Sequence, residues 1–169
     1  GQTGVQVGEE VAISALDVRQ PRLPEPGETI FGASYAVVPG GKGLNQAVAA
    51  ARAGGTVAFL GAVGVDAFGA QLRATLIADG IDVTRLAETD VETGTAHIAV
   101  VDGGENSIVV VPGANAAVTT LADGDVAVIS ATSYLVVQLE RPLVLVAEAL
   151  RLARRHGVTT VLTPAPVQD

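Results

Sequence analysis

One lysine lies among three glycines directly before an alanine-rich run, and this arrangement suits a ligand-binding loop. Residues 38–54 read VPGGKGLNQAVAAARAG. Glycine adopts backbone angles closed to other residues, so Gly41 suits a loop whose backbone approaches a ligand closely. The run that follows has strong helix propensity, and free N–H groups at a helix N-terminus favour oxygen-rich or anionic ligands. Lys42 and Asn45 are the polar side chains expected to point into such a site.

The loop matches neither of two common nucleotide-binding patterns. The Walker pattern requires Ser or Thr directly after the lysine, and Gly43 follows Lys42. The dinucleotide fingerprint G-x-G-x-x-G, counted from Gly41, needs a glycine where Gln46 stands. From these residues alone two interpretations stay open: a ligand loop of another kind, or a glycine turn that only connects a strand to a helix.

The elements expected around this loop alternate between strand and helix. Apolar spacing, helix propensity and Gly or Pro end signals predict helices at 43–53, 68–78 and 142–155. Apolar runs predict strands at 5–13, 29–38, 57–60, 134–138 and 158–162, and a hairpin of strands at 95–101 and 107–111. The alternation predicts βαβ units in a parallel sheet. The hairpin and the strand at 29–38 do not fit such a sheet and suit a small separate layer.

The composition of the chain predicts a soluble, cytoplasmic α/β protein. Apolar residues make up 49% of the 169 residues and aromatic residues only 3%, so the core is built from small aliphatic side chains, which suit a parallel sheet covered on both faces. The chain has no cysteine, which excludes disulfides and thiolate metal sites. The net charge of −8 argues against nucleic acid or an anionic membrane as a partner. We recognise no targeting segment and no membrane-spanning run.

Further motifs follow the same order as those of a known family. They are RLPEPGETI at 22–30, GGKGLNQAVAAAR at 40–52, TGTAHI at 93–98, ENSIVVVPGAN at 105–115, QLERPL at 138–143 and TPAP at 163–166. From about Pro21 onward the chain resembles the ribokinase (PfkB) family of sugar kinases. The resemblance implies a single ribokinase-like three-layer α/β domain over residues 1–169. It also implies a small β-sheet lid, formed by residues of about 17–38 and 94–111.

The resemblance also implies an activity, a substrate and a homodimer formed through the lid. The parent reaction transfers the γ-phosphoryl group of ATP, with Mg²⁺, to the primary hydroxyl of a pentose, D-ribose being expected. The implied substrate-binding residues are Gly41, Lys42, Asn45, Ala96, Ile108, Glu140 and Asp17. Lys42, Asn45 and Glu140 would bind sugar hydroxyls, and Ala96 and Ile108 would form an apolar wall. Each of these residues could instead have a purely structural role. Asn45 could cap a helix, Glu140 could form an ion pair with Arg141, and Ala96 and Ile108 could serve only in packing.

Two departures from the family pattern limit these expectations. The second half of family members carries a D-T-x-G-A-G-D motif, which supplies the catalytic base and most of the ATP and monovalent-cation site, and these 169 residues contain no such motif. The resemblance therefore implies a sugar-binding half, with the C-terminal half absent, that is inactive alone. The family also opens with G-S-x-N-x-D, whose Asp binds sugar hydroxyls. Here Ala15 stands at that position, and Asp17 replaces it only after a shift of two residues.

Several alternatives remain open at this stage. The chain is also compatible with a non-catalytic sugar-binding or lid-mediated interaction module, and with half of a kinase for a nucleoside or another sugar. Residues 125–130 (DVAVIS) have the β-branched content of a strand, whereas the resemblance implies a short helix, which we expect. Asp66 is expected to cap a helix, and His97 to point off the lid because it alternates with its neighbours.

Overall fold

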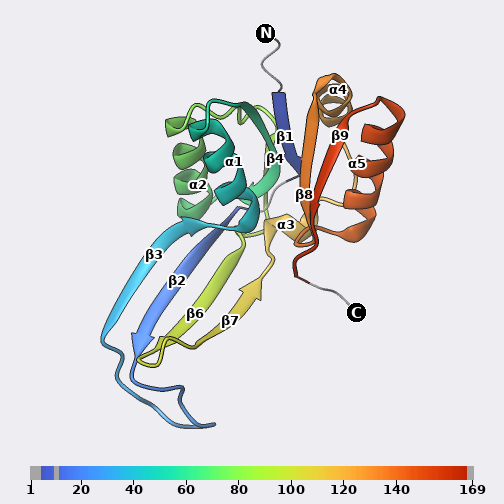
Figure 1. Cartoon of the computed structure of the whole chain (residues 1–169). Helices are drawn as coiled ribbons and strands as arrows, with labels where there is room; N and C mark the ends of the chain where they lie inside the picture. Colours follow the sequence, from blue (N-terminus) through green and yellow to red (C-terminus); the bar gives the residue numbers. More distant parts are fainter. Residues whose placement is uncertain (1–4, 10–11, 167–169) are drawn as a thin grey trace.

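A twisted parallel sheet forms the centre of the computed structural model, which describes residues 5–9 and 12–166 (Figure 1). The strands lie in the order β5-β4-β1-β8-β9, and all neighbours pair in parallel. Their bounds are β1 (Val5–Glu9), β4 (Thr56–Gly64), β5 (Leu86–Thr89), β8 (Tyr134–Gln138) and β9 (Thr159–Thr163). The expected parallel sheet is confirmed.

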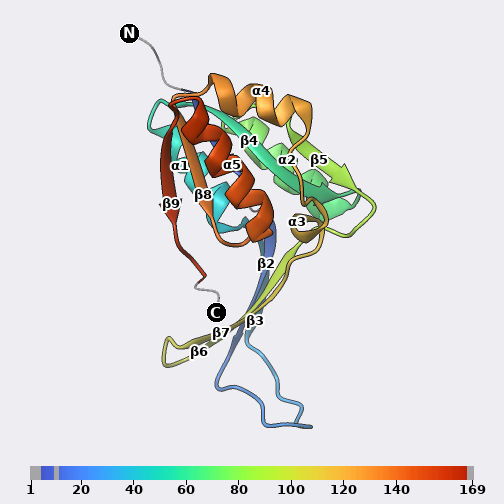
Figure 2. The same cartoon turned by 90° about the vertical axis from the view of Figure 1, so that its right-hand side faces the viewer.

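Helices cover both faces of this first sheet, which gives the expected three layers (Figures 1 and 2). One face packs against α1 (Lys42–Arg52) and α2 (Ala67–Ala78), and the other against α4 (Asp123–Ala131) and α5 (Leu143–Arg155). Strand β4 shows the alternation that a doubly covered strand requires: Phe59 packs toward α1 and α2, whereas Leu60 packs toward α4 and α5.

Local end signals explain where the long helices stop. Gly54, Gly80 and Gly157 follow α1, α2 and α5 and have φ values of 93°, 72° and 71°. This left-handed conformation, which glycine adopts at low cost, turns the chain away from the helix and satisfies its last carbonyls. None of the helices within the described residues is long and apolar enough to cross a membrane.

A second sheet projects from one end of the first (Figures 1 and 2). Its order is β3-β2-β6-β7, formed by β2 (Ile13–Gln20), β3 (Ser34–Gly40), β6 (Thr95–Val101) and β7 (Asn106–Val111). The pairs β2–β3 and β6–β7 are antiparallel, and β2–β6 is parallel. The hairpin expected around residues 102–105 is therefore confirmed. A short helix, α3 (Ala114–Ala117), follows β7.

Some expectations about individual elements need correction. The sequence predicted one strand over 5–13, whereas the structure forms β1 and a separate strand, β2, that had not been expected. The Pro- and Gly-rich stretch 21–32 joins β2 to β3 within the second sheet. The short edge strand β5 was also missed. Residues 125–130 lie in α4, as the family resemblance implied, and the β-branched signal there was wrong.

Candidate functional site

The glycine loop and the end of β8 meet at the carboxyl edge of the first sheet, where open α/β sheets bind ligands. Gly41 has φ 102°, a conformation that side-chain-bearing residues rarely adopt, and it directly precedes α1. The next residue, Lys42, donates from Nζ to Oε1 of Glu140, which follows β8. The sequence had offered Arg141 as the ion-pair partner of Glu140, whereas the structure pairs Glu140 with Lys42.

The two oxygens of the Glu140 carboxylate differ in their contacts, because Oε1 accepts from Lys42 whereas Oε2 does not. The side chain of Glu140 is only 10% exposed. Oε2 is buried and has no hydrogen-bond partner among the described residues. A buried carboxylate oxygen without a donor is unfavourable, so this atom favours a ligand that brings a hydroxyl or N–H group.

A cavity of about 220 Å³ lies beside Glu140, between the two sheets. Its walls come from elements distant in sequence: β2, β7, α3, the end of β8 and the segment after β9. The lining residues are Ile13, Val110, Pro112, Asn115, Leu139, Glu140 and Pro166. Mostly apolar walls with one carboxylate suit a small ligand that carries hydroxyl groups on an apolar ring.

The face of the second sheet that borders this cavity carries three of the expected residues. Strand pairing aligns Asp17 with Ile98 and Ile98 with Ile108, so the three form one row across the sheet. The next row, two residues along each strand, contains Ala96 and Val110. Residues two apart on a strand share a face, and Val110 lines the cavity. Ala96, Ile108 and Asp17 therefore lie on the cavity side.

Within this face, Asp17 is the only carboxylate in its row, and one of its oxygens is unsatisfied among the described residues. Oδ1 of Asp17 is buried without a hydrogen-bond partner. Ala15, at the position where the family has its Asp, lies on the same face in the row of Ala96. His97 lies on the opposite face and is exposed, as expected from the alternation.

Asn45 lies on the first turns of α1 and is exposed. The helix has Gly41 as its N-cap without a side-chain cap bond, so Asn45 does not act as the cap. The structure thus brings Gly41, Lys42 and Glu140 together at one sheet edge, with Asn45 on the adjoining helix.

Three residues that the sequence had not singled out brace this edge. Gln46 donates from Nε2 to Oγ1 of Thr163 at 3.1 Å, and its Oε1 accepts a hydrogen bond from Nε2 of Gln138. The contacts tie α1 to the carboxyl ends of β8 and β9. Their positions in the sequence could have indicated them. Gln46 directly follows Asn45, and the family motifs at 138–143 and 163–166 begin with Gln138 and Thr163.

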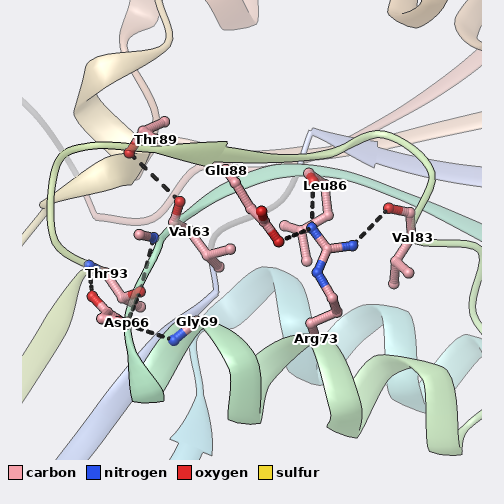
Figure 3. A network of polar contacts seen from close by, with 10 residues as sticks. Val63, Asp66, Gly69, Arg73, Val83, Leu86, Glu88, Thr89 and Thr93 are labelled. Carbon is pink, nitrogen blue, oxygen red and sulfur yellow. Dashed lines mark hydrogen bonds and ion pairs between the residues drawn. The ribbon is translucent and has the colours of Figure 1, made fainter.

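A second polar network connects α2 to the base of the second sheet (Figure 3). Asp66 caps α2 by accepting from Gly69 N–H at 2.7 Å, which confirms the expected cap. The same carboxylate accepts from the backbone N–H and the hydroxyl of Thr93, each at 2.7 Å. Gly64 N–H donates to the Thr93 hydroxyl at 2.9 Å. Since Thr93 lies just before β6, Asp66 fixes the point where the chain passes from the first sheet into β6 of the second sheet.

The environment of Asp66 favours its ionised form. Desolvation by partial burial acts to raise its pKa, but hydrogen bonds from Thr93 and from the N-terminus of α2 outweigh burial. The net result holds the pKa of the Asp66 carboxyl below its ordinary value of 3.8.

The parallel sheet and the projecting second sheet define an α/β fold of the ribokinase type. The sequence profile of the pfkB family carbohydrate kinases matches residues 9–169, and the chain belongs to this family. It is 42% identical to Haemophilus influenzae ribokinase over 150 residues, which are 88% of this chain and 49% of that protein. It is 40% identical to Bacillus subtilis ribokinase over 155 residues, 90% of this chain and 53% of that protein.

A solved structure agrees with these relatives. Arabidopsis thaliana ribokinase, complexed with ribose and ATP, superposes with a TM-score of 0.86 at 27% identity, covering 96% of this chain and 54% of that chain. The present chain therefore spans about half the length of the relatives it matches.

Proposed function

We propose that this chain is the sugar-binding half of an ATP-dependent carbohydrate kinase, with a pentose, D-ribose, as the phosphoryl acceptor. The observation that carries the proposal is the buried Oε2 of Glu140, which has no hydrogen-bond partner within residues 5–9 and 12–166 and lies beside Lys42 at the cavity between the two sheets. The ribose in the Arabidopsis relative's structure supports the choice of sugar.

Each polar residue of the site has a distinct role in this proposal. Glu140 accepts a hydrogen bond from a sugar hydroxyl through Oε2, while its ion pair with Lys42 holds the carboxylate in place. Lys42 and Asn45 donate to neighbouring hydroxyls, and the amide of Asn45 also accepts. Gly41 lets the backbone approach the sugar, since a side chain there would strain the loop.

The second sheet acts as the lid in this proposal, over residues of about 17–38 and 94–111. Ala96 and Ile108 form the apolar wall against the sugar ring. Asp17 supplies the carboxylate that Ala15 lacks, from the neighbouring row on the same face. Its buried Oδ1, which finds no hydrogen-bond partner in the part of the chain that the structure describes, supports this substitution. The sugar hydroxyl that donates a hydrogen bond to Asp17 would lie nearer to Ile108 than to Ala96.

A homodimer formed through the lid is part of the same proposal. The face opposite the sugar carries an open groove of about 330 Å³ lined partly by Leu16, Val18, Tyr35 and Val109. Burial of these side chains by a second lid would be favourable. A lid variant such as Tyr35→Glu should therefore lower the sedimentation coefficient of the chain if the dimer forms this way.

Phosphoryl transfer also needs positioned phosphates, charge neutralisation and a base. The described residues contain no group of three or more His, Asp or Glu side chains that would hold a metal ion. We propose that the residues for ATP, Mg²⁺ and the monovalent cation lie outside these 169 residues, because the D-T-x-G-A-G-D motif of the family is absent from them. Purified alone, the 169-residue chain should not phosphorylate ribose, and measurable ATP-dependent phosphorylation would contradict this part of the proposal.

Calorimetric titration with D-ribose tests the sugar site directly. The chain should bind ribose, and Asn45→Ala and Glu140→Gln should each weaken binding by about tenfold or more, since one good hydrogen bond to a charged or amide group is lost. Asn106→Ala, an amide at the far end of the second sheet, is the matched control and should bind as the parent does. Absence of binding by a folded chain would contradict the proposal.

Two other functions predict different experimental outcomes. A non-catalytic sugar-binding module would bind ribose in the same way, but joining the chain to a ribokinase second half would produce no kinase activity. A kinase half for another acceptor would bind a nucleoside or another sugar in preference to ribose. Ala15 in place of the family Asp is the feature that favours a changed acceptor.

A further inference from the structure

The cavity between the two sheets holds a buried amide side chain that the proposed function does not use. Asn115 of α3 lines this cavity together with Glu140 and is 0% exposed. We propose that the carboxamide oxygen of Asn115 is a second hydrogen-bond acceptor for the ligand, so that the cavity recognises two hydroxyl groups of a neutral sugar. This inference rests on the proposed function, because it adds a specificity-determining residue to the same site.

The hydrogen bonds of Asn115 fix the orientation of its amide. Nδ2 donates to the backbone carbonyl of Ala12 at 3.1 Å and to that of Pro112 at 3.2 Å. Only the nitrogen of a carboxamide can donate, and it has two hydrogens. The two carbonyl partners therefore identify the nitrogen and use both of its hydrogens. Oδ1 is the atom that remains for a ligand, and it can only accept.

This oxygen lacks a donor within the described part of the chain. Oδ1 of Asn115 is buried and has no hydrogen-bond partner among residues 5–9 and 12–166, and the same holds for Oε2 of Glu140. Buried polar atoms of folded proteins nearly always have a partner, because a buried acceptor without a donor is unfavourable. Two such acceptors beside one cavity favour a single ligand that brings two donors.

The packing around Asn115 holds the acceptor in place before a ligand arrives. The backbone N–H of Asn115 donates to the carbonyl of Pro112 at 3.2 Å. Gly94, just before β6, packs against the donor side of the amide, since a Cβ there would lie 2.7 Å from Nδ2 of Asn115. A fixed acceptor loses little conformational freedom on binding, which favours affinity and specificity.

The remaining walls of the cavity indicate the class of ligand. They are formed by Ile13, Val110, Pro112, Leu139 and Pro166. Within the described residues no Lys, Arg or His lines the cavity, and the neighbouring Lys42 donates to Glu140. An anionic group placed between two acceptors would be desolvated without a donor, which is strongly unfavourable. The cavity therefore suits a neutral ligand with two hydroxyl groups and an apolar edge.

Calorimetric titration with D-ribose and with sugars that each lack one of its hydroxyls tests the role of Asn115. In the parent chain, the sugar without the hydroxyl that Asn115 binds should bind about fivefold or more weakly than D-ribose. In Asn115→Leu, this sugar and D-ribose should bind equally well. Asn106→Leu makes the same substitution at an exposed amide of β7 and should keep the discrimination of the parent.

This comparison separates recognition from a structural role. Asn115→Leu also removes the two bonds from Nδ2, so it can loosen the cavity. Loosening weakens every sugar alike and leaves the ratio between two sugars unchanged, whereas loss of one hydrogen bond changes that ratio. An ordered water on Oδ1 in place of a sugar hydroxyl would likewise leave the ratio as it is in the parent.

Nuclear magnetic resonance of the parent chain keeps the test decisive if Asn115→Leu folds poorly. Addition of D-ribose should shift the side-chain carbonyl carbon of Asn115, and that of Asn106 should stay unchanged. Ribose binding without this shift, or with the parent's discrimination retained in Asn115→Leu, would overturn the inference and leave the proposed function standing. Absence of ribose binding by the folded chain would overturn both.

Discussion

Lys42 forms an ion pair with Glu140 although 98 residues separate them in the chain. The lysine is the first residue of α1 and the glutamate follows β8, so the pair closes the carboxyl edge of the first sheet from two sides. Burial is uneven, because the Lys42 side chain is 42% exposed and that of Glu140 only 10%. The contact thus places a nearly buried carboxylate next to a flexible, solvated cation.

A double-mutant cycle should measure this pair. With Lys42→Met and Glu140→Gln, we expect a coupling free energy of about 0.5–1 kcal/mol from denaturant unfolding, since one partner is substantially solvated. The more exposed pair Arg22–Glu28 is the comparison and should show weaker coupling, because solvent screens both of its side chains more strongly. Equal coupling in the two pairs would show that burial of Glu140 does not strengthen its interaction.

Loss of the Asp66 carboxylate should destabilise the chain through two elements at once. Asp66→Ala removes the cap of α2, worth about 1 kcal/mol, and leaves the buried donors of Thr93 without an acceptor, worth about 1–2 kcal/mol more. We expect a fall of about 2–3 kcal/mol in the free energy of unfolding, measured with urea. Asp90→Ala, an exposed loop aspartate, should change it by less than about 0.5 kcal/mol. A similar effect for both variants would contradict the bridging role.

The depressed pKa of Asp66 predicts how stability depends on pH. A carboxyl with a lower pKa in the folded than in the unfolded state stabilises the fold above its ordinary value of 3.8. That stabilisation disappears as pH falls through the folded-state pKa. The difference in unfolding free energy between the parent and Asp66→Asn should therefore be largest near neutral pH and shrink in acid. A difference that grows toward low pH would mean that the pKa shift has the opposite sign.

Gly64 should be sensitive to the smallest substitution, although its backbone conformation is ordinary. A Cβ at this position would lie 2.6 Å from Oδ2 of Asp66 and 2.6 Å from the backbone N of Thr93. Relief of that overlap must displace the network, so Gly64→Ala should lower stability by about 1–3 kcal/mol. Gly103→Ala is the matched control, because a Cβ there meets nothing within 4 Å. Thermal unfolding compares them, and an unchanged Tm for Gly64→Ala would refute the close packing.

The sequence predicted the helices and the core strands well because their signals are local. Propensity and end residues located α1, α2 and α5 to within about one residue. By contrast, α4 carries β-branched residues, and tertiary packing of Ile129 against the sheet decides its conformation. The sequence did not predict that β1 and β2 are separate strands. They follow each other closely in the chain but belong to different sheets, and no local pattern indicates such a change of sheet.

For the site, residue types were predictable but partners were not. The glycine loop and Glu140 were recognisable from the family motifs, whereas the choice of Lys42 over Arg141 as ion-pair partner depends on how α1 packs beside β8. Asp17 is the sharpest case. The sequence placed it two positions from the family Asp, and only the structure shows that both positions lie on one strand, β2, and therefore share a face.

The second sheet is held to the first sheet at one end and projects freely at the other. Its base is fixed at Ser14, whose N–H donates to Gly94, and at Thr93 through Asp66. Its tip, residues 21–33, is largely exposed and points away from the first sheet (Figure 2). Eight residues of β2 make an arm of roughly 26 Å at about 3.3 Å per residue. A rotation of about 10° at the base moves the tip by roughly 4–5 Å, so small displacements near Asp66 are amplified along the arm.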